Sequence, residues 1–493
     1  MGMLKLYADV SKLDADAVAL IVRKNYSLTA TGKALDRMLQ KAIGSILKSE
    51  SFQIKDGNVQ VFYTGQNKFE RILLIASAAE GNSVNALREA ACIALKTARK
   101  RGYKSIAIAF DPRTENEIQA IGEGALLGCY EYERYKTQKA VKPAQRDIYI
   151  VTSIKAERAI ERARIFAEAT ITVRDLVNEP PNILNVGRLT QVAQKMAREN
   201  RLEIRIFNAN QLDKMGANAF LSVGKGSVTQ GRMVQLVYRP RGKAKGHVAI
   251  VGKGILFDSG GLSLKNDQQM LHMKSDMAGA ATALTSVAAA AQLKLAVSVS
   301  AILMLTENMP DGGANRPGDV VRAMNGKTIE ITNTDAEGRL ALADGLTYAA
   351  RLDPKPDVIL DIATLTGAQI IALGKLVGAI MGNNSRLLQQ LSIAGEMAGE
   401  TMWPLPLPHQ YRDLMKSDIA DIKNSSGVPE AGSILGGLFL SEFVDHSNWA
   451  HLDIAGPSWQ DREWGVYTRN ASGFGSRCLL TFLSNLAGKS GNI

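Results

Sequence analysis

Short apolar runs alternate with helix-forming stretches along most of the chain, and this alternation restricts the fold more than any other feature of the sequence. In the first 160 residues the apolar runs occupy 18–22, 59–63, 72–76, 105–109 and 148–151, and helix-forming stretches occupy 83–100 and 114–130. Strands that alternate with helices in this way predict an α/β domain.

A charged, helix-forming segment follows at 155–177 and ends before Pro180 and Pro181, which stop a helix. We predict a domain junction there, with a smaller N-terminal α/β domain at 1–160, a linker helix at 161–180 and a larger C-terminal domain at 181–493. One long helix within a single domain is the alternative.

The C-terminal part continues the alternation with longer elements. Strands are predicted at 247–252, 297–305, 358–363 and 377–381, and helices at 278–292, 340–351 and 433–444. This order predicts an α/β domain with a mostly parallel central sheet covered by helices. Ligands bind such sheets beyond the carboxyl ends of the strands, so the polar segments after the strands are the candidate functional positions.

The sequence contains no pattern typical of secretion or of a membrane span. Asp9, Asp14 and Asp16 interrupt the N-terminus where a signal peptide has an apolar core, and the longest apolar stretch, 295–305, is too short to cross a bilayer. The three cysteines lack the spacing of a disulfide framework or of a thiolate zinc site. We therefore expect a soluble, cytoplasmic protein with no membrane partner.

The basic excess is concentrated near the N-terminus. The formal net charge is +11, and residues 1–178, with 28 Lys and Arg against 20 Asp and Glu, carry +8 of it. A solvated surface explains a diffuse excess without an arginine-rich run or interleaved aromatic residues. DNA binding through this basic surface stays an open alternative.

The first polar segment after a predicted strand is GKGILFDSGGLSLK, residues 252–265. Its four glycines allow tight turns and would bring Lys253, Asp258 and Lys265 towards one place. A phosphate-binding loop is the alternative for this segment, but the chain lacks the Walker spacing.

The second segment, NTDAEGRLALADGL at 333–346, places Asp335, Glu337 and Arg339 within five residues. If the turn is extended, both carboxylates can point at one centre. The alternative is an ordinary helix N-terminus, where acidic residues are favourable.

With Asp276, these segments supply four carboxylates, whereas the five histidines of the chain form no pair at ligand spacing. Carboxylate-rich clusters with little imidazole suit two divalent ions that share bridging oxygens. Four buried acids without metal would repel one another, so a metal pair is the simplest way to neutralise them. A lysine in such a site can be a ligand only as the neutral amine.

The sequence resembles the leucyl aminopeptidases, also called cytosol aminopeptidases. NTDAEGRL at 333–340 is identical to the signature octapeptide of that family, and GKGILFDSGG, KSDMAGAA, ENMPDGGANRPGDVV, ATLTGA and AHLDIAG extend the resemblance over about residues 165–480. The N-terminal portion is similar only in length and in pieces such as GALLGCYEYERYK. The resemblance implies a metal-dependent aminopeptidase, a homo-hexamer of two trimers, and, for some bacterial members, separate DNA binding.

The resemblance also implies a set of site residues. One metal ion, Mn²⁺ or Zn²⁺, would be held by Lys253, Asp258, Asp276 and Glu337, and the other by Asp258, Asp335 and Glu337. Lys265 matches the lysine that points at the scissile carbonyl oxygen, and Arg339 matches the arginine that holds a bicarbonate ion as the general base. Thr364, Leu365 and Gly367 match the segment that lines the substrate cleft, and Met273 matches a wall of the pocket for the N-terminal side chain.

These roles are chemically coherent. Two metal ions lower the pKa of an attacking water, and one of them takes the free amine of the peptide, which restricts the reaction to the N-terminal residue. Lys265 would stabilise the negative charge that grows on the carbonyl oxygen. We expect leucine and other apolar residues, including methionine, to be released preferentially. A catalytically inactive scaffold is a third interpretation, which the intact set of site residues disfavours.

The remaining aromatic and imidazole side chains are expected only to pack or to lie on the surface. They are Trp403, Trp449, Trp459, Trp464, His247, His272, His409, His446 and His451.

Overall fold

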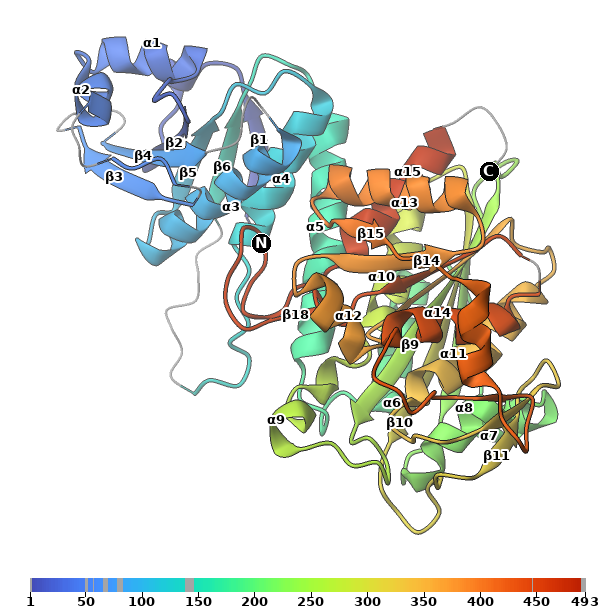
Figure 1. Ribbon diagram of the computed structural model, residues 1–493. Coiled ribbons are helices and arrows are strands. Elements are labelled where there is room, and N and C mark those ends of the chain that lie inside the picture. Colours follow the sequence, from blue (N-terminus) through green and yellow to red (C-terminus); the bar gives the residue numbers. More distant parts are fainter. Residues whose placement is uncertain are drawn as a thin grey trace. The chain divides into compact units, whose positions relative to one another are not determined.

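The computed structural model describes residues 2–48, 52–55, 57–64, 70–77, 83–137, 146–445 and 447–488. The chain divides into two compact units, one of residues 1–171 with 463–468 and one of residues 172–462 with 469–493. Both units are α/β, as the alternation of strands and helices predicts (Figure 1). Among the described residues, no helix is both long enough and apolar enough to cross a membrane.

The N-terminal unit is built on a six-stranded sheet in the order β1-β6-β5-β2-β4-β3, and every neighbouring pair except β4 and β3 is parallel. The strands are β1 Met3–Tyr7, β2 Ala17–Arg23, β3 Val59–Tyr63, β4 Arg71–Ser77, β5 Ser105–Ala109 and β6 Asp147–Val151. The helices are α1 Ala30–Met38, α2 Ala42–Lys48, α3 Val84–Lys100, α4 Glu115–Gly128 and the first part of α5, Glu157–Asn178.

The local sequence accounts for these elements. Residues 17–22 of β2 are all buried, as expected for a central strand covered on both faces. Ser83 and Thr114 cap α3 and α4, because each side-chain oxygen accepts a hydrogen bond from a backbone N–H three residues later. The two helices pack closely at Gly124, where an added Cβ would lie 1.9 Å from the carbonyl oxygen of Arg88.

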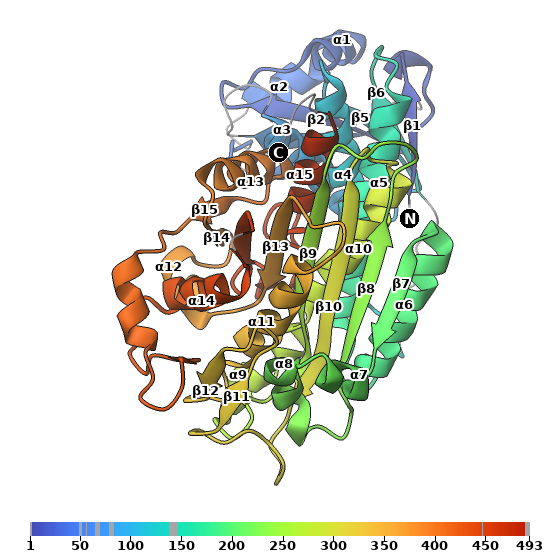
Figure 2. The same ribbon diagram turned by 90° about the vertical axis from the view of Figure 1, so that its right-hand side faces the viewer.

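The larger unit contains an eight-stranded sheet in the order β15-β14-β17-β13-β9-β10-β8-β7 (Figure 2). Its strands are β7 Glu203–Phe207, β8 Arg232–Tyr238, β9 His247–Asp258, β10 Ser298–Asn308, β13 Val358–Ala363, β14 Gly378–Gly382, β15 Met402–Pro404 and β17 Trp449–Asp453. The four central strands, β17, β13, β9 and β10, are parallel, so their carboxyl ends meet at one edge of the sheet.

Helices cover both faces of this sheet. An added Cβ at Gly252 of β9 would meet the backbone of Ala280 in α10, whereas Gly345 of α11 approaches the side chain of Val251. Successive residues of a strand face opposite sides, so α10 and α11 lie on opposite faces. The remaining bounds are α6 Val186–Asn200, α7 Ala209–Lys214, α8 Asn218–Val223, α9 Asp267–Met270, α10 Ala278–Gln292, α11 Glu337–Ala350, α12 Gly367–Leu373, α13 Ser385–Ala398, α14 Gly432–Leu440 and α15 Ser476–Gly488.

Two small sheets complete the larger unit. One has the order β11-β12-β16 and the other pairs β18 with β19. Their strands are β11 Val320–Arg322, β12 Thr328–Glu330, β16 Ile422–Lys423, β18 Trp459–Gln460 and β19 Asn470–Ala471.

The predicted strand at 247–252 is six residues too short. Gly252 and Gly254 do not form turns, because β9 continues through them to Asp258. These glycines instead allow close backbone approach, since an added Cβ would lie 2.6 Å from the Cα of Ala280 and 2.7 Å from the carbonyl oxygen of Met304, respectively. The tight turn expected here does occur at Gly260 and Gly261, whose φ angles are +88° and +66°.

Candidate active site

The last part of β9 supplies two of the predicted site residues, Lys253 and Asp258. Five positions apart on a regular strand, they would face opposite sides of the sheet. Between Thr306 and Asn308 of β10, however, the register with β9 shifts by one residue, because Thr306 pairs with Ile255 and Asn308 with Asp258. A bulge of one residue in β9 therefore turns both side chains to the same side.

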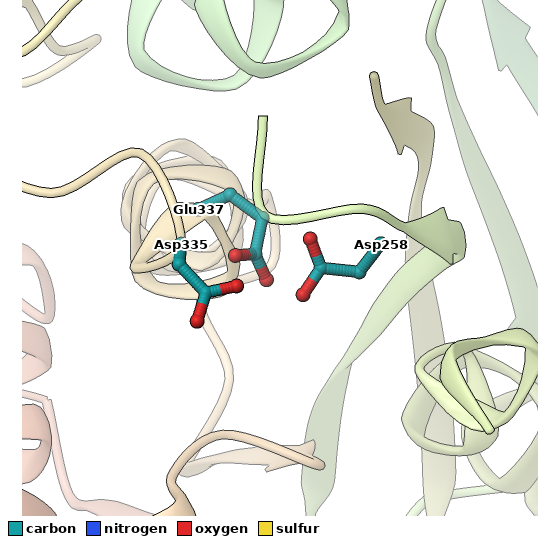
Figure 3. Close-up of side chains that lie close together, drawn as sticks. All are labelled: Asp258, Asp335 and Glu337. Carbon is teal, nitrogen blue, oxygen red and sulfur yellow. The ribbon is translucent and has the colours of Figure 1, made fainter. Parts of the chain in front are cut away.

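Three carboxylates meet beyond this edge of the sheet (Figure 3). Asp258 ends β9, Glu337 begins α11, and Asp335 lies in the turn before α11. One oxygen from each lies within 4.8 Å of those of the other two. Glu337 lies in the first turn of α11, where an acid is favourable in any helix, but helix capping does not explain why its carboxylate meets those of Asp258 and Asp335.

Two lysines bridge these acids. Lys253 is 3% exposed, and its Nζ donates to Asp276 Oδ1 at 2.7 Å and lies 2.9 Å from Glu337 Oε1. The Nζ of Lys265 lies 2.8 Å from Asp258 Oδ2 and also contacts Asp335 Oδ1. Burial alone would lower the pKa of both amines, but the surrounding carboxylates outweigh it and raise both pKa values.

The acids themselves are costly to keep charged. Burial, reinforced by neighbouring carboxylates, raises the pKa values of Asp276, Asp335 and Glu337. Asp276 Oδ2 and Glu337 Oε2 are buried and have no hydrogen-bond partner among the described residues. Buried oxygens with unused lone pairs, at the edge of a converging carboxylate cluster, suit divalent cations. The donor set thus fits the metal pair that the sequence predicts.

Arg339 lies in the first turn of α11, two residues after Glu337. Its Nη1 donates to the backbone carbonyl of Asn424 at 2.6 Å, and its Nε is buried without a partner. Burial lowers the pKa of Arg339 to about 10, so the guanidinium keeps its charge at neutral pH. Unlike the other predicted site residues, Arg339 does not line the cavity described next.

A cavity of about 460 Å³ opens beside the cluster, a volume suited to a small ligand or the end of a peptide. All the predicted metal ligands and Lys265 line it. So do the four residues predicted to bind substrate, which are Met273, Thr364, Leu365 and Gly367.

Several residues around the site were not predicted to have a role there. Trp459 and His272, expected only to pack, line the cavity, and their rings lie 5.2 Å apart. Asn308 donates a hydrogen bond to Asp258 Oδ1 at 2.8 Å. Asn424 Oδ1 accepts a hydrogen bond from the N–H of Thr332 and so stabilises the turn before α11. A packing tryptophan and a lining one look alike in sequence, and a buried asparagine carries no spacing signal.

The other described histidines either pack or lie on the surface, as expected, and His409 is exposed. His247 and His451 are buried, and His451 Nδ1 lies 2.5 Å from Asp361 Oδ1. His446 lies outside the described residues.

Comparison with known proteins matches the whole arrangement to one family. The family model described as "Cytosol aminopeptidase family, catalytic domain" matches residues 171–480, and that of the family's N-terminal domain matches residues 19–139. Proteins named "probable cytosol aminopeptidase" from Persephonella marina and Aquifex aeolicus are each 39% identical to this chain. The first alignment covers 95% of this chain and 96% of the relative, and the second covers 90% of each. Among solved structures, the bottromycin maturation enzyme BotP in complex with Mn superposes with a TM-score of 0.85 at 32% identity, over 96% of this chain and 100% of that one.

Proposed function

Because the chain belongs to the cytosol aminopeptidase family, whose members are metal-dependent aminopeptidases, we propose that it is a two-metal leucyl aminopeptidase. It would release leucine and other apolar residues from the N-termini of peptides. The observation that carries this proposal is the meeting of Asp258, Asp335 and Glu337 within 4.8 Å at the mouth of a peptide-sized cavity.

We assign one ion to Asp258, Asp276, Glu337 and Lys253, and the other to Asp258, Asp335 and Glu337. Lys253 would be a ligand only as the neutral amine, so the ion would have to replace the proton that the carboxylates hold on it. The orphaned oxygens of Asp276 and Glu337 support this division, because each has a lone pair that no described residue uses. Bound there, a pair of Mn²⁺ or Zn²⁺ ions would supply Lewis-acid polarisation of the carbonyl and an activated water at neutral pH. The Mn-bound BotP structure supports manganese as one candidate for this chain.

The residues of the chain itself would orient the peptide and stabilise charge. Lys265 carries an ammonium group into the cavity, where it would donate to the scissile carbonyl oxygen as negative charge grows there. The unpartnered Nε of Arg339 supports a bound anion such as bicarbonate, which would accept the proton of the attacking water. Arg339 cannot itself be that base, since it stays protonated at neutral pH.

The cavity wall supports a preference for apolar N-terminal residues. Met273, Leu365, Ile370 and Trp459 line it together with the small residues Gly367, Ala455 and Gly456. This apolar part of the wall would bury an aliphatic side chain, while charged and polar residues line the rest of the cavity.

The proposal is tested by hydrolysis of leucine anilide with chelator-stripped protein, before and after addition of Mn²⁺ or Zn²⁺. We expect activity only with metal, and none on the substrate with an acetylated amine. Metal-independent activity, or equal hydrolysis of the acetylated substrate, would refute the assignment.

Three further properties stay predictions for this chain. They are assembly into a homo-hexamer, a cytoplasmic location, and DNA binding through the basic N-terminal surface. Sedimentation tests the first. Duplex titration at several salt concentrations tests the last, because phosphate contacts make affinity fall steeply with salt.

A further inference from the structure

Two loops of the larger unit face the cavity and follow neighbouring parallel strands. The first, residues 364–367, follows β13, and the second, residues 454–456, follows β17. Thr364, Leu365, Thr366 and Gly367 line the cavity from one loop, and Ala455 and Gly456 line it from the other.

One carboxylate joins the two loops. Asp453, the last residue of β17, is fully buried. Its Oδ1 accepts the N–H of Leu365 at 3.1 Å and the N–H of Ala455 at 3.2 Å, and its Oδ2 accepts the hydroxyl of Thr366 at 2.7 Å. Both carboxylate oxygens are thus used, and all three donors belong to residues that line the cavity.

The hydroxyl of Thr366 extends this connection. Because it donates to Asp453, its bond of 2.8 Å with Ser433 must be donated by Ser433 Oγ, and it also accepts the N–H of Gln369 at the start of α12. A second tie runs in parallel, since the N–H of Gly456 donates to the side-chain oxygen of Gln369 at 2.6 Å.

The first loop also touches the carboxylate cluster. The carbonyl of Thr364 accepts a hydrogen bond from Lys253 at 2.9 Å, and its hydroxyl donates to Asp276 at 2.7 Å. A shift of this loop would therefore move a cavity wall relative to the carboxylate cluster. In a peptidase, such a displaced wall would weaken substrate binding.

The geometry points to Asp453 as a positioning residue that fixes the width of the substrate cleft. It does so by holding the loops at 364–367 and 454–456 at a set separation. This role rests on the proposed function for its kinetic consequence, but the loop restraint itself does not depend on activity.

Two substitutions separate hydrogen bonding from charge. In Asp453→Ala, two buried N–H groups and one hydroxyl lose their acceptor. In Asp453→Asn, the remaining oxygen can still accept the N–H groups of Leu365 and Ala455, and the new amide can donate to Thr366 if the hydroxyl of Thr366 donates to Ser433 instead. The alanine variant should therefore be clearly worse than the asparagine variant.

Asp361→Ala is the matched control. Asp361 lies on the adjacent strand β13 and is equally buried, but its carboxylate contacts His451 and the indole N–H of Trp449 rather than the cavity loops. This control should lose stability without a change in KM or in loop exchange.

The first readout is hydrogen–deuterium exchange by mass spectrometry on metal-loaded protein. We expect Asp453→Ala to speed exchange in peptides that cover 364–367 and 454–456, and Asp361→Ala to leave these peptides unchanged. Unchanged exchange in a folded Asp453→Ala protein would overturn the inference whether or not the protein hydrolyses peptides.

The second readout is steady-state kinetics with leucine anilide, with metal content measured alongside. Asp453→Ala should raise KM about tenfold, equivalent to about 1.4 kcal/mol, with bound metal unchanged and a smaller effect on kcat. An equal loss in Asp453→Asn would contradict the inference, because charge rather than loop geometry would then be the cause. If Asp453→Ala does not fold, Thr366→Val replaces it. This variant removes the hydroxyl that donates to Asp453, together with its bonds to Ser433 and Gln369, and keeps the N–H groups of Leu365 and Ala455 on Asp453. An unchanged KM there would also count against the inference. Failure of the wild-type protein to hydrolyse the anilide with metal would refute the proposed function alone.

Discussion

Replacement of Lys265 by alanine separates catalysis from metal binding. The Nζ of Lys265 lies 2.8 Å from Asp258 Oδ2, and the side chain is 11% exposed. Because little water surrounds the ammonium group, its charge interacts strongly with a developing oxyanion. Loss of one donor to a developing oxyanion typically lowers kcat by about 10²–10³, or about 2.7–4 kcal/mol. We expect a loss of kcat in that range for Lys265→Ala.

Metal content should not fall in this variant. The ammonium group of Lys265 lies against Asp258 and Asp335, so its removal takes a competing cation away from two proposed ligands. The assay is leucine anilide turnover together with metal analysis of the same sample. Lys327→Ala is the control, because Lys327 also pairs with a carboxylate, that of Glu442, and does not line the cavity. Loss of metal in step with activity would make Lys265 a ligand, and an unchanged kcat would remove it from catalysis.

Three other substitutions give independent checks. Asp335→Asn should weaken Mn²⁺ binding about tenfold or more, because it removes one of the charged ligands, and a fully loaded, fully active variant would exclude Asp335 from the site. Trp459→Ala should lower the ratio of kcat/KM for leucine anilide over alanine anilide about tenfold, because it removes an apolar wall of the cavity; an unchanged ratio would place Trp459 outside the pocket. Burial raises the pKa of Asp344 to about 7 from an ordinary value of 3.8, so this acid ionises first in the unfolded chain and stability should fall as pH rises from about 4 to about 7. Asp344→Asn should flatten that part of the pH dependence in urea unfolding, and an unaltered slope would refute the cause.

The sequence predicts the regular elements where local pattern and burial agree. The strands at 59–63, 105–109 and 358–363 and the helix at 278–292 match β3, β5, β13 and α10 residue for residue. The edge strands β7 and β15, and β8 next to β7, are not predicted, because their pairing depends on partners distant in the chain rather than on local periodicity.

In the candidate site, too, the sequence predicts what depends on neighbouring residues and not what depends on contacts between distant segments. The spacing of Asp335 and Glu337 predicts neighbouring carboxylates, since both residues lie at one helix start. The bulge that brings Lys253 and Asp258 to one side depends on the register with β10, which the sequence does not specify. Asp453 lies in the motif AHLDIAG, but its three donors come from contacts across two loops and have no signature of their own.

The separation of Arg339 from the cavity is also a tertiary effect. Its position in α11, two residues after Glu337, predicts proximity to the carboxylates, yet its guanidinium is held by the carbonyl of Asn424. Because Arg339 does not line the cavity, its guanidinium would act on the substrate through a bound anion. This agrees with the proposed bicarbonate rather than with direct contact between Arg339 and the peptide.

The central claim is that two ions per chain are needed for catalysis. Titration of chelator-stripped protein with Mn²⁺, with bound metal and leucine anilide hydrolysis followed in the same samples, tests it most directly. We predict that binding saturates at two ions per chain and that activity appears with the second. Saturation of activity at one ion per chain, or full activity without any, would contradict the assignment of Asp258 and Glu337 as bridging ligands.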